Sequence, residues 1–234
     1  MEIIFTDTIG VDPEFAPTSA SSNLPEWYVK SKSYVHDKKE AENSMTTATI
    51  KRCMPVFDLI VNGYLIYSYV DVFITQPNQI YKGKLKKVPM YQWPSYDPIH
   101  FHAEEQFIDH FKNPGYAIPK WVNAWGIKTP PGYSCIFSHP KQRDLPFTIF
   151  EGIVDTDKYV SPVNFPFTLN DPDFEGLIPA GTPIAQVTPF KRESWKMSLG
   201  SDKDRVDALQ NSASLKTRFF DSYKTRFRQV KEYK

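Results

Sequence analysis

WVNAWGIKTPPGYSCIFSHP, residues 121–140, decides the fold together with FTIFEGIVDT at 147–156, VNFPFTL at 163–169 and PIAQVTPF at 183–190. Each apolar run has the length of a strand, turn residues separate the runs, and there is almost no helical periodicity. This pattern is typical of an all-β barrel or sandwich. Because proline cannot donate a ladder hydrogen bond, strands that carry it should be edges or end at bulges.

The segments on either side of this β-region predict helices and a division into three parts. Pro25 near a capping Asn23 favours a short helix that carries Trp27 and Tyr28. After an Asn62-Gly63 turn, YLIYSYVDVFIT at 64–75 predicts a strand. We expect a mainly β (α+β) chain: an N-terminal extension with short helices (1–60), a β-barrel domain (61–192) and a basic amphipathic C-terminal helix (193–234).

Composition narrows the class of protein. The 234 residues include 20 prolines and only 10 glycines, so the chain makes many stiff turns, and 41% hydrophobic residues suffice for a core. No stretch has the roughly 18 consecutive apolar residues of a membrane span, and the N-terminus lacks the features of a signal peptide. We therefore expect no membrane partner. We expect the protein to act in a reducing cytoplasm, in which Cys53 and Cys135 stay separate thiols.

Charge is balanced overall, with 28 basic and 27 acidic residues, but it is concentrated at the C-terminus. From Lys216 onward there are seven basic and two acidic residues. An apolar stripe at helical spacing accompanies them: Leu215, Phe219, Tyr223, Phe227 and Val230. A nucleic-acid arm would not need that stripe. We therefore favour docking of the tail on an acidic protein surface, of the same or a neighbouring subunit, over nucleic acid.

Four blocks in the β-region resemble the barrel of dUTPases and dCTP deaminases, which are trimeric nucleotide enzymes. The blocks occur in the family's order over about 60 residues: PPGY at 130–133, HPKQR at 139–143, GIVDTDKY at 152–159 and GTPIAQ at 181–186. The resemblance implies a dUTPase-like (β-clip) barrel that assembles as a homotrimer. It also implies a ligand site with Asp155, Asp157 and Tyr159, with Lys141 or Arg143 contacting phosphate.

The catalytic elements depart from that family's pattern. The resemblance gives Asp155 the role of activating water, but Lys158 is inserted before Tyr159, which on a strand moves the ring to the opposite face. His139-Pro140-Lys141-Gln142 replaces the Pro-Arg-Ser-Gly phosphate loop, and no glycine-rich arm follows Gln186. We therefore expect a scaffold without its usual catalysis and assign no catalytic residue and no cofactor. Nucleotide binding or hydrolysis stays as an alternative.

A second resemblance covers nearly the whole chain. TIKRCMPVFDLIVNGY at 49–64, the PPGY and GIVDTDKY blocks, IPAGTPIAQVTPFKR at 178–192 and the end of the chain are similar to an uncharacterised protein family of tailed bacteriophages. This resemblance implies a phage origin, with a place in the host cytoplasm or the virion and a phage or host protein as partner. We expect a non-catalytic oligomeric structural or protein-interaction module.

A histidine pair leaves a third hypothesis open. His100 and His102 lie two residues apart, and His102, Glu104 and His139 match the order of a two-histidine, one-carboxylate iron site. The other interpretation is an exposed polar turn after Pro98, and it carries more weight because an HxH pair alone is a weak signal. We therefore predict no metal ligands and keep a non-haem metal enzyme as a further alternative.

Overall fold

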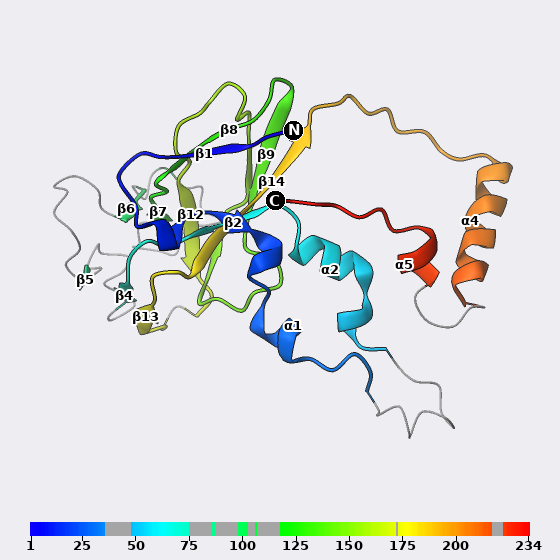
Figure 1. Cartoon of the computed structure of the whole chain (residues 1–234), viewed down its shortest axis with the longest axis horizontal. Helices are drawn as coiled ribbons and strands as arrows, with labels where there is room; N and C mark the ends of the chain where they lie inside the picture. The colour runs from blue at the N-terminus through cyan, green and yellow to red at the C-terminus, as the bar shows by residue number, and fades with distance from the viewer. Residues whose placement is uncertain are drawn as a thin grey trace. The chain divides into compact units, whose positions relative to one another are not determined.

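The structure is a computed structural model, and it describes most of the chain. The described residues are 1–35, 48–74, 86–87, 98–102, 106, 118–171, 173–216 and 222–234. They form two compact units (Figure 1). The β-unit comprises residues 1–23, 63–192 and 233, and the helical unit comprises residues 24–62, 193–232 and 234.

The β-unit contains all the described strands, and every described strand pair is antiparallel. Its largest sheet has five strands in the order β11 (Gly152–Val154), β9 (Tyr133–Ser138), β14 (Pro183–Lys191), β3 (Tyr64–Tyr67) and β2 (Thr18–Ser19). A four-stranded sheet has the order β10 (Phe147–Ile149), β12 (Phe165–Leu169), β7 (Pro119–Trp121) and β6 (Ile99–Phe101). A three-stranded sheet has the order β13 (Gly176–Ile178), β4 (Val72–Ile74) and β5 (Lys86–Lys87). A two-stranded sheet pairs β1 (Ile4–Asp7) with β8 (Trp125–Lys128). The predicted mainly β fold is confirmed.

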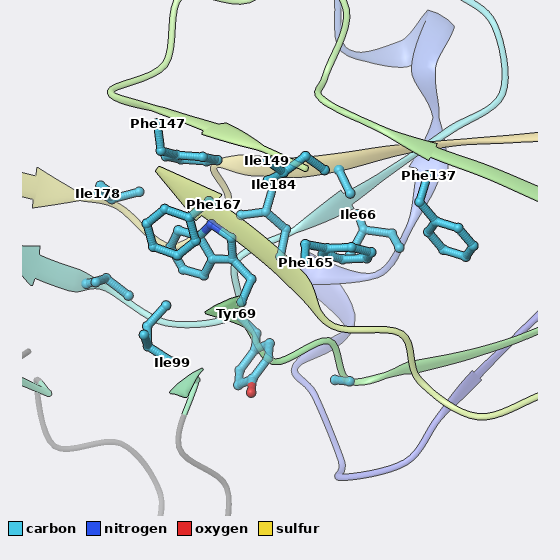
Figure 2. Packing of buried hydrophobic residues seen from close by; sticks show 14 of the residues in the cluster. Ile66, Tyr69, Ile99, Phe137, Phe147, Ile149, Phe165, Phe167, Ile178 and Ile184 are labelled. Carbon is cyan, nitrogen blue, oxygen red and sulfur yellow. The ribbon is translucent and has the colours of Figure 1, made fainter. Parts of the chain in front are cut away.

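One hydrophobic core joins these sheets (Figure 2). At its centre Trp121 stacks on Phe167 with ring centroids 5.2 Å apart, and Phe147 packs against both rings. Alternation along the strands explains the burial, because in β12 Phe165, Phe167 and Leu169 face inward while the residues between them do not.

Prolines occur at the ends of some described strands and inside others. Pro183 and Pro119 are the first residues of β14 and β7. Pro189 lies inside β14, but β3 pairs with β14 only as far as Val187, so Pro189 is flanked by β9 alone. At Pro189 the strand β14 is therefore locally an edge, but Pro166 lies in β12, an inner strand that pairs with both β10 and β7, so the prediction that strands carrying proline are edges is wrong there.

The N-terminal boundary differs from the one predicted at residue 60. Residues 1–23 lie in the β-unit, because β1 pairs with β8 and β2 pairs with β3. Two single-turn 3-10 helices, η1 (Pro13–Phe15) and η2 (Ala20–Ser22), lie on either side of β2. The predicted strand at 64–75 is also divided into β3 and β4 at Ser68–Asp71, where Ser68 accepts from and donates to the backbone of Val70.

The helical unit contains α1 (Glu26–Lys30), η4 (Ile50–Arg52) and α2 (Met54–Ile60). Helix α1 carries Trp27 and Tyr28 after Pro25, as predicted. Tyr28, Ile60 and Val61 form a small core. No helix among the described residues has the length and apolar character needed to cross a bilayer.

The C-terminal segment is not the single amphipathic helix that we predicted. Helix α4 (Asp202–Lys216) is exposed at almost every position, α5 (Ser222–Arg226) is one short turn, and no helix covers residues 193–201 or 228–234. Phe219 lies outside the described residues, and Val230 lies beyond the end of α5. The residues of the predicted apolar stripe therefore do not all lie on one continuous helix.

Two basic residues of the tail bind a carboxylate within the helical unit. Arg228 donates to Oδ1 of the buried Asp58 from Nε at 2.9 Å and Nη2 at 2.6 Å, and Lys231 donates to Oδ2 at 3.1 Å. The hydrogen bond from Arg228 holds the pKa of Asp58 below its ordinary value. The tail is therefore fixed by pairing to a carboxylate of α2 in the same chain.

Candidate functional site

The segment that follows β11 is a turn. Strand β11 ends at Val154, and the backbone N–H groups of Lys158 and Tyr159 both donate to the carbonyl of Asp155. Residues 155–159 therefore do not alternate as a strand, and Lys158 does not move the Tyr159 ring to the opposite face of a strand as predicted. Tyr159 is exposed.

Asp157 is the buried carboxylate of this turn. Its side chain is only 2% exposed. Its Oδ2 accepts from the backbone N–H of Gly132 at 2.9 Å and from Arg192 Nη2 at 2.5 Å, while Oδ1 accepts from Arg192 Nη1 at 2.8 Å. This two-point arrangement is the strong geometry of an arginine–carboxylate pair.

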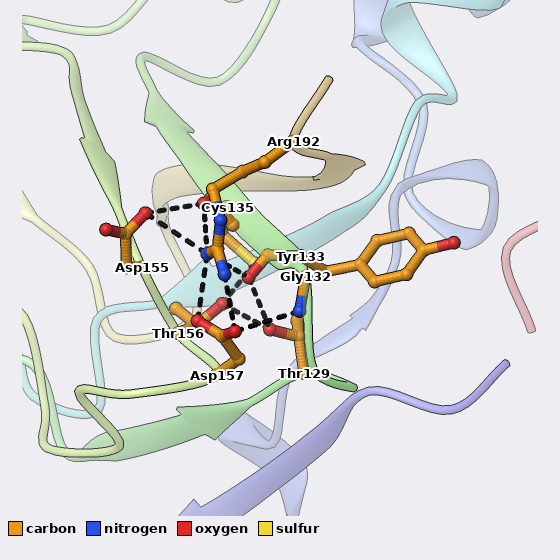
Figure 3. A network of polar contacts seen from close by, with 9 residues as sticks. Thr129, Gly132, Tyr133, Cys135, Asp155, Thr156, Asp157 and Arg192 are labelled. Carbon is orange, nitrogen blue, oxygen red and sulfur yellow. Dashed lines mark hydrogen bonds and ion pairs between the residues drawn. The ribbon is translucent and has the colours of Figure 1, made fainter. Parts of the chain in front are cut away.

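Asp155 contacts the same Arg192 guanidinium, but its side chain faces solvent. Its side chain is 62% exposed, and Oδ1 accepts from Ser134 Oγ at 2.6 Å and from Arg192 Nη1 at 3.2 Å. Arg192 is the first residue after β14, and its backbone N–H donates to the backbone carbonyl of Gly132 at 2.9 Å. We call Arg192, Asp155, Asp157, Gly132 and Ser134 the Arg192 clamp (Figure 3).

The pairing of Arg192 with Asp157 favours the charged forms of these two side chains. Hydrogen bonds from Arg192 and from the Gly132 backbone hold the pKa of Asp157 far below its ordinary value. The same pairing with Asp157 raises the pKa of Arg192. Asp157 is therefore held as a carboxylate that binds Arg192 and Gly132, whereas the resemblance to dUTPases assigns the activation of water to Asp155.

Buried polar contacts among Thr156, Thr129 and Cys135 stabilise the turn at residues 155–159. Thr156 is fully buried, its hydroxyl lies 2.8 Å from that of Thr129, and it also donates to Cys135 Sγ at 3.3 Å. Burial raises the pKa of the Cys135 thiol, which keeps it protonated. Cys53 and Cys135 are separate free thiols.

Lys141 and Arg143 lie at the opposite end of β9 from the clamp. They follow Ser138, whereas the clamp surrounds Gly132 and Ser134, a separation of roughly 17 Å along an extended strand. Lys141 pairs with Glu151 at 2.7 Å, and Arg143 donates to the backbone carbonyl of Asn23. Within one chain the structure therefore joins Asp155 and Asp157 but does not bring either cation to them.

The histidines do not form a metal centre among the described residues. His102 contacts Gln106 through Nδ1 at 3.0 Å, and Glu104 lies outside the described part of the chain. The ring of His139 packs edge-on against Phe147, and burial lowers its pKa. No group of three His, Cys, Asp or Glu side chains that could hold a metal ion occurs in the described ranges.

Arg192 is the residue that sequence reasoning missed. It ends the block IPAGTPIAQVTPFKR, which we used only as a strand and for its family resemblance. Two aspartates separated by a single residue can share a compensating cation, but more than thirty residues separate Arg192 from them. The pairing depends on β14 lying beside β9 and β9 beside β11.

The clamp predicts a specific pH dependence. The folded pKa of Asp157 lies below the unfolded value of about 4, so its stabilisation is complete above that pH and declines as the pH falls further. The difference in unfolding free energy between the native chain and Asp157→Asn should therefore be constant near neutral pH and shrink below about pH 4. Urea unfolding across this range measures it. A difference that persists unchanged into acid would contradict the assignment, and the exposed Asp155→Asn serves as the matched control.

Comparison with protein-family models and with curated proteins finds no match for this chain. The resemblances to the dUTPase barrel and to a phage family therefore remain predictions.

Proposed function

We propose that the chain is a non-catalytic, self-assembling protein-interaction module of a tailed bacteriophage, used in the host cytoplasm or in the virion. Its partners are other copies of itself, in a homotrimer, and a phage or host protein. The observation that carries the proposal is an exposed apolar segment that begins immediately after the Arg192 clamp.

This segment is residues 193–200, which we call the arm. It has neither helix nor strand, and Figure 1 shows it as the long connection between β14 and α4. Trp195, Met197 and Leu199 are 88%, 82% and 92% exposed. Covering each of these side chains would contribute roughly 1.5–3 kcal/mol, so three together provide a substantial driving force for association.

The Arg192 clamp supports a structural role for Asp155 and Asp157, which lie in the GIVDTDKY block that resembles a catalytic motif of dUTPases. In this chain Asp157 is used to bind the first residue after β14, and Asp155 shares the same guanidinium. The carboxylates thereby fix the point at which the arm begins. A fixed starting point reduces the conformational entropy that the arm loses on docking.

The non-catalytic part of the proposal predicts the outcome of a nucleotide assay. Incubation with each deoxynucleoside triphosphate and Mg²⁺ should release no pyrophosphate and should leave the thermal unfolding midpoint unchanged, because Asp155 and Asp157 are engaged by Arg192 and the two cations lie elsewhere in the chain. The matched control is Asp155→Asn. Pyrophosphate release that this substitution abolishes would refute the proposal in favour of a nucleotide hydrolase.

A further inference from the structure

The apolar residues of the arm alternate with polar ones. Trp195, Met197 and Leu199 are separated by Lys196 and Ser198. In an extended chain successive side chains point to opposite faces, so the three apolar side chains share one face. We call them the apolar row. A segment with this alternation is suited to join the edge of a sheet as an added strand, with its row covered on one side.

Among the described residues the five-stranded sheet of the β-unit has two edge strands, β2 and β11. At one end, Ser19 of β2 donates to the backbone carbonyl of Tyr233, so the C-terminus already contacts that edge. At the other end, β11 is bordered by β9 alone among the described residues. Ile153 in the middle of β11 is 64% exposed, and a Cβ placed on Gly152 would meet no atom within 4 Å. Edge strands of this kind pair readily with another chain.

The starting point of the arm and this edge are close together in every copy. The arm begins after Arg192, which binds Asp155, and Asp155 directly follows β11. A copy that meets a neighbour at this surface can therefore offer its arm to the neighbour's β11, and in a closed trimer each copy donates its arm to the next. Eight residues extend at most roughly 28 Å, which restricts the acceptor to a neighbour whose clamp lies nearby.

Charge is compatible with this pairing. The arm after Arg192 contains one acidic and one basic residue, Glu193 and Lys196. The end of β11 presents the largely exposed carboxylate of Asp155. Strand β11 itself (Gly152–Val154) carries no charged residue, so no like charge on this strand opposes an approaching arm.

We propose that residues 193–200 of one copy dock as an added strand on the β11 edge of a second copy, with the apolar row against Ile153. This inference rests on the proposed self-assembly and names the surface through which it occurs.

Disulfide trapping between two differently tagged full-length chains tests the inference. Both chains carry Cys53→Ser. One also carries Ile153→Cys, and the other carries a cysteine at one position of the apolar row (Trp195→Cys, Met197→Cys or Leu199→Cys). The controls are Ser194→Cys, Lys196→Cys and Ser198→Cys, which lie on the opposite face, and Leu177→Cys as an alternative acceptor on the exposed part of β13.

At least one row position should form about tenfold more mixed covalent dimer with Ile153→Cys than any control, because only cysteines with Cα atoms within roughly 7 Å can be bridged. An oligomeric protein that shows no such preference, or that prefers Leu177→Cys, overturns the inference and leaves self-assembly intact. A native chain that is monomeric at all concentrations overturns both. Circular dichroism of each variant verifies folding, and Ile153→Lys, which leaves the arm intact, should shift the assembly toward monomer.

Discussion

Replacing Phe167 by alanine is expected to lower the free energy of unfolding by about 3–5 kcal/mol. Phe167 is almost completely buried, and its ring contacts those of Trp121 and Phe147, with centroid distances of 5.2 and 5.5 Å. The substitution removes both ring contacts and leaves a cavity where β12 meets the other sheets. Denaturant unfolding followed by circular dichroism measures the loss.

Phe73→Ala is the matched control for this prediction. Phe73 lies on β4 and is substantially exposed, so the same chemical change should cost about 1 kcal/mol or less. Equal losses for the two variants would show that the aromatic cluster around Trp121 is not the centre of the core.

Gly63→Ala is expected to be the second strongly destabilising substitution. Gly63 has φ +81°, a conformation that costs an L-residue roughly 1–2 kcal/mol. In addition, its Cβ would lie 2.0 Å from the carbonyl oxygen of Val187 in β14, so the backbone must shift. Such overpacking costs typically about 1–3 kcal/mol more.

Gly132→Ala separates these two contributions. Gly132 also has a positive φ, +87°, but a Cβ there would meet no atom within 4 Å. Its alanine variant keeps the N–H that binds Asp157 and should show the conformational cost alone. Thermal unfolding of the two variants side by side measures the difference, and equal losses would mean that β14 relaxes away from the Gly63 turn.

The local features of the fold could be predicted from the sequence. Strands β9 and β12 lie within the apolar runs that predicted them, β14 extends one residue beyond its run, and the Asn62-Gly63 turn immediately precedes β3. These features depend on neighbouring residues, through alternation and turn chemistry. The turn at 155–159 was misassigned as strand, because its Thr and Val neighbours favour strands while the backbone hydrogen bonds to Asp155 favour a turn.

The features that define the candidate site depend on contacts that are distant in sequence. The Arg192 clamp requires β11, β9 and β14 to be adjacent, and periodicity does not specify that order. The pairing of β1 with β8 joins residues more than a hundred positions apart. The tail was predicted as one helix from its apolar spacing, yet Arg228 and Lys231 bind Asp58 from a segment that is not helical.

The mass of the intact chain in solution tests self-assembly through the arm most directly. Light scattering after size exclusion, over a range of concentrations, should give a multiple of the single-chain mass, three being the expected number. The variant Trp195→Ser, Met197→Ser, Leu199→Ser should give the single-chain mass with an unchanged circular dichroism spectrum. An intact chain that remains a monomer at every concentration, or an arm variant that assembles as well as the intact chain, would contradict the account.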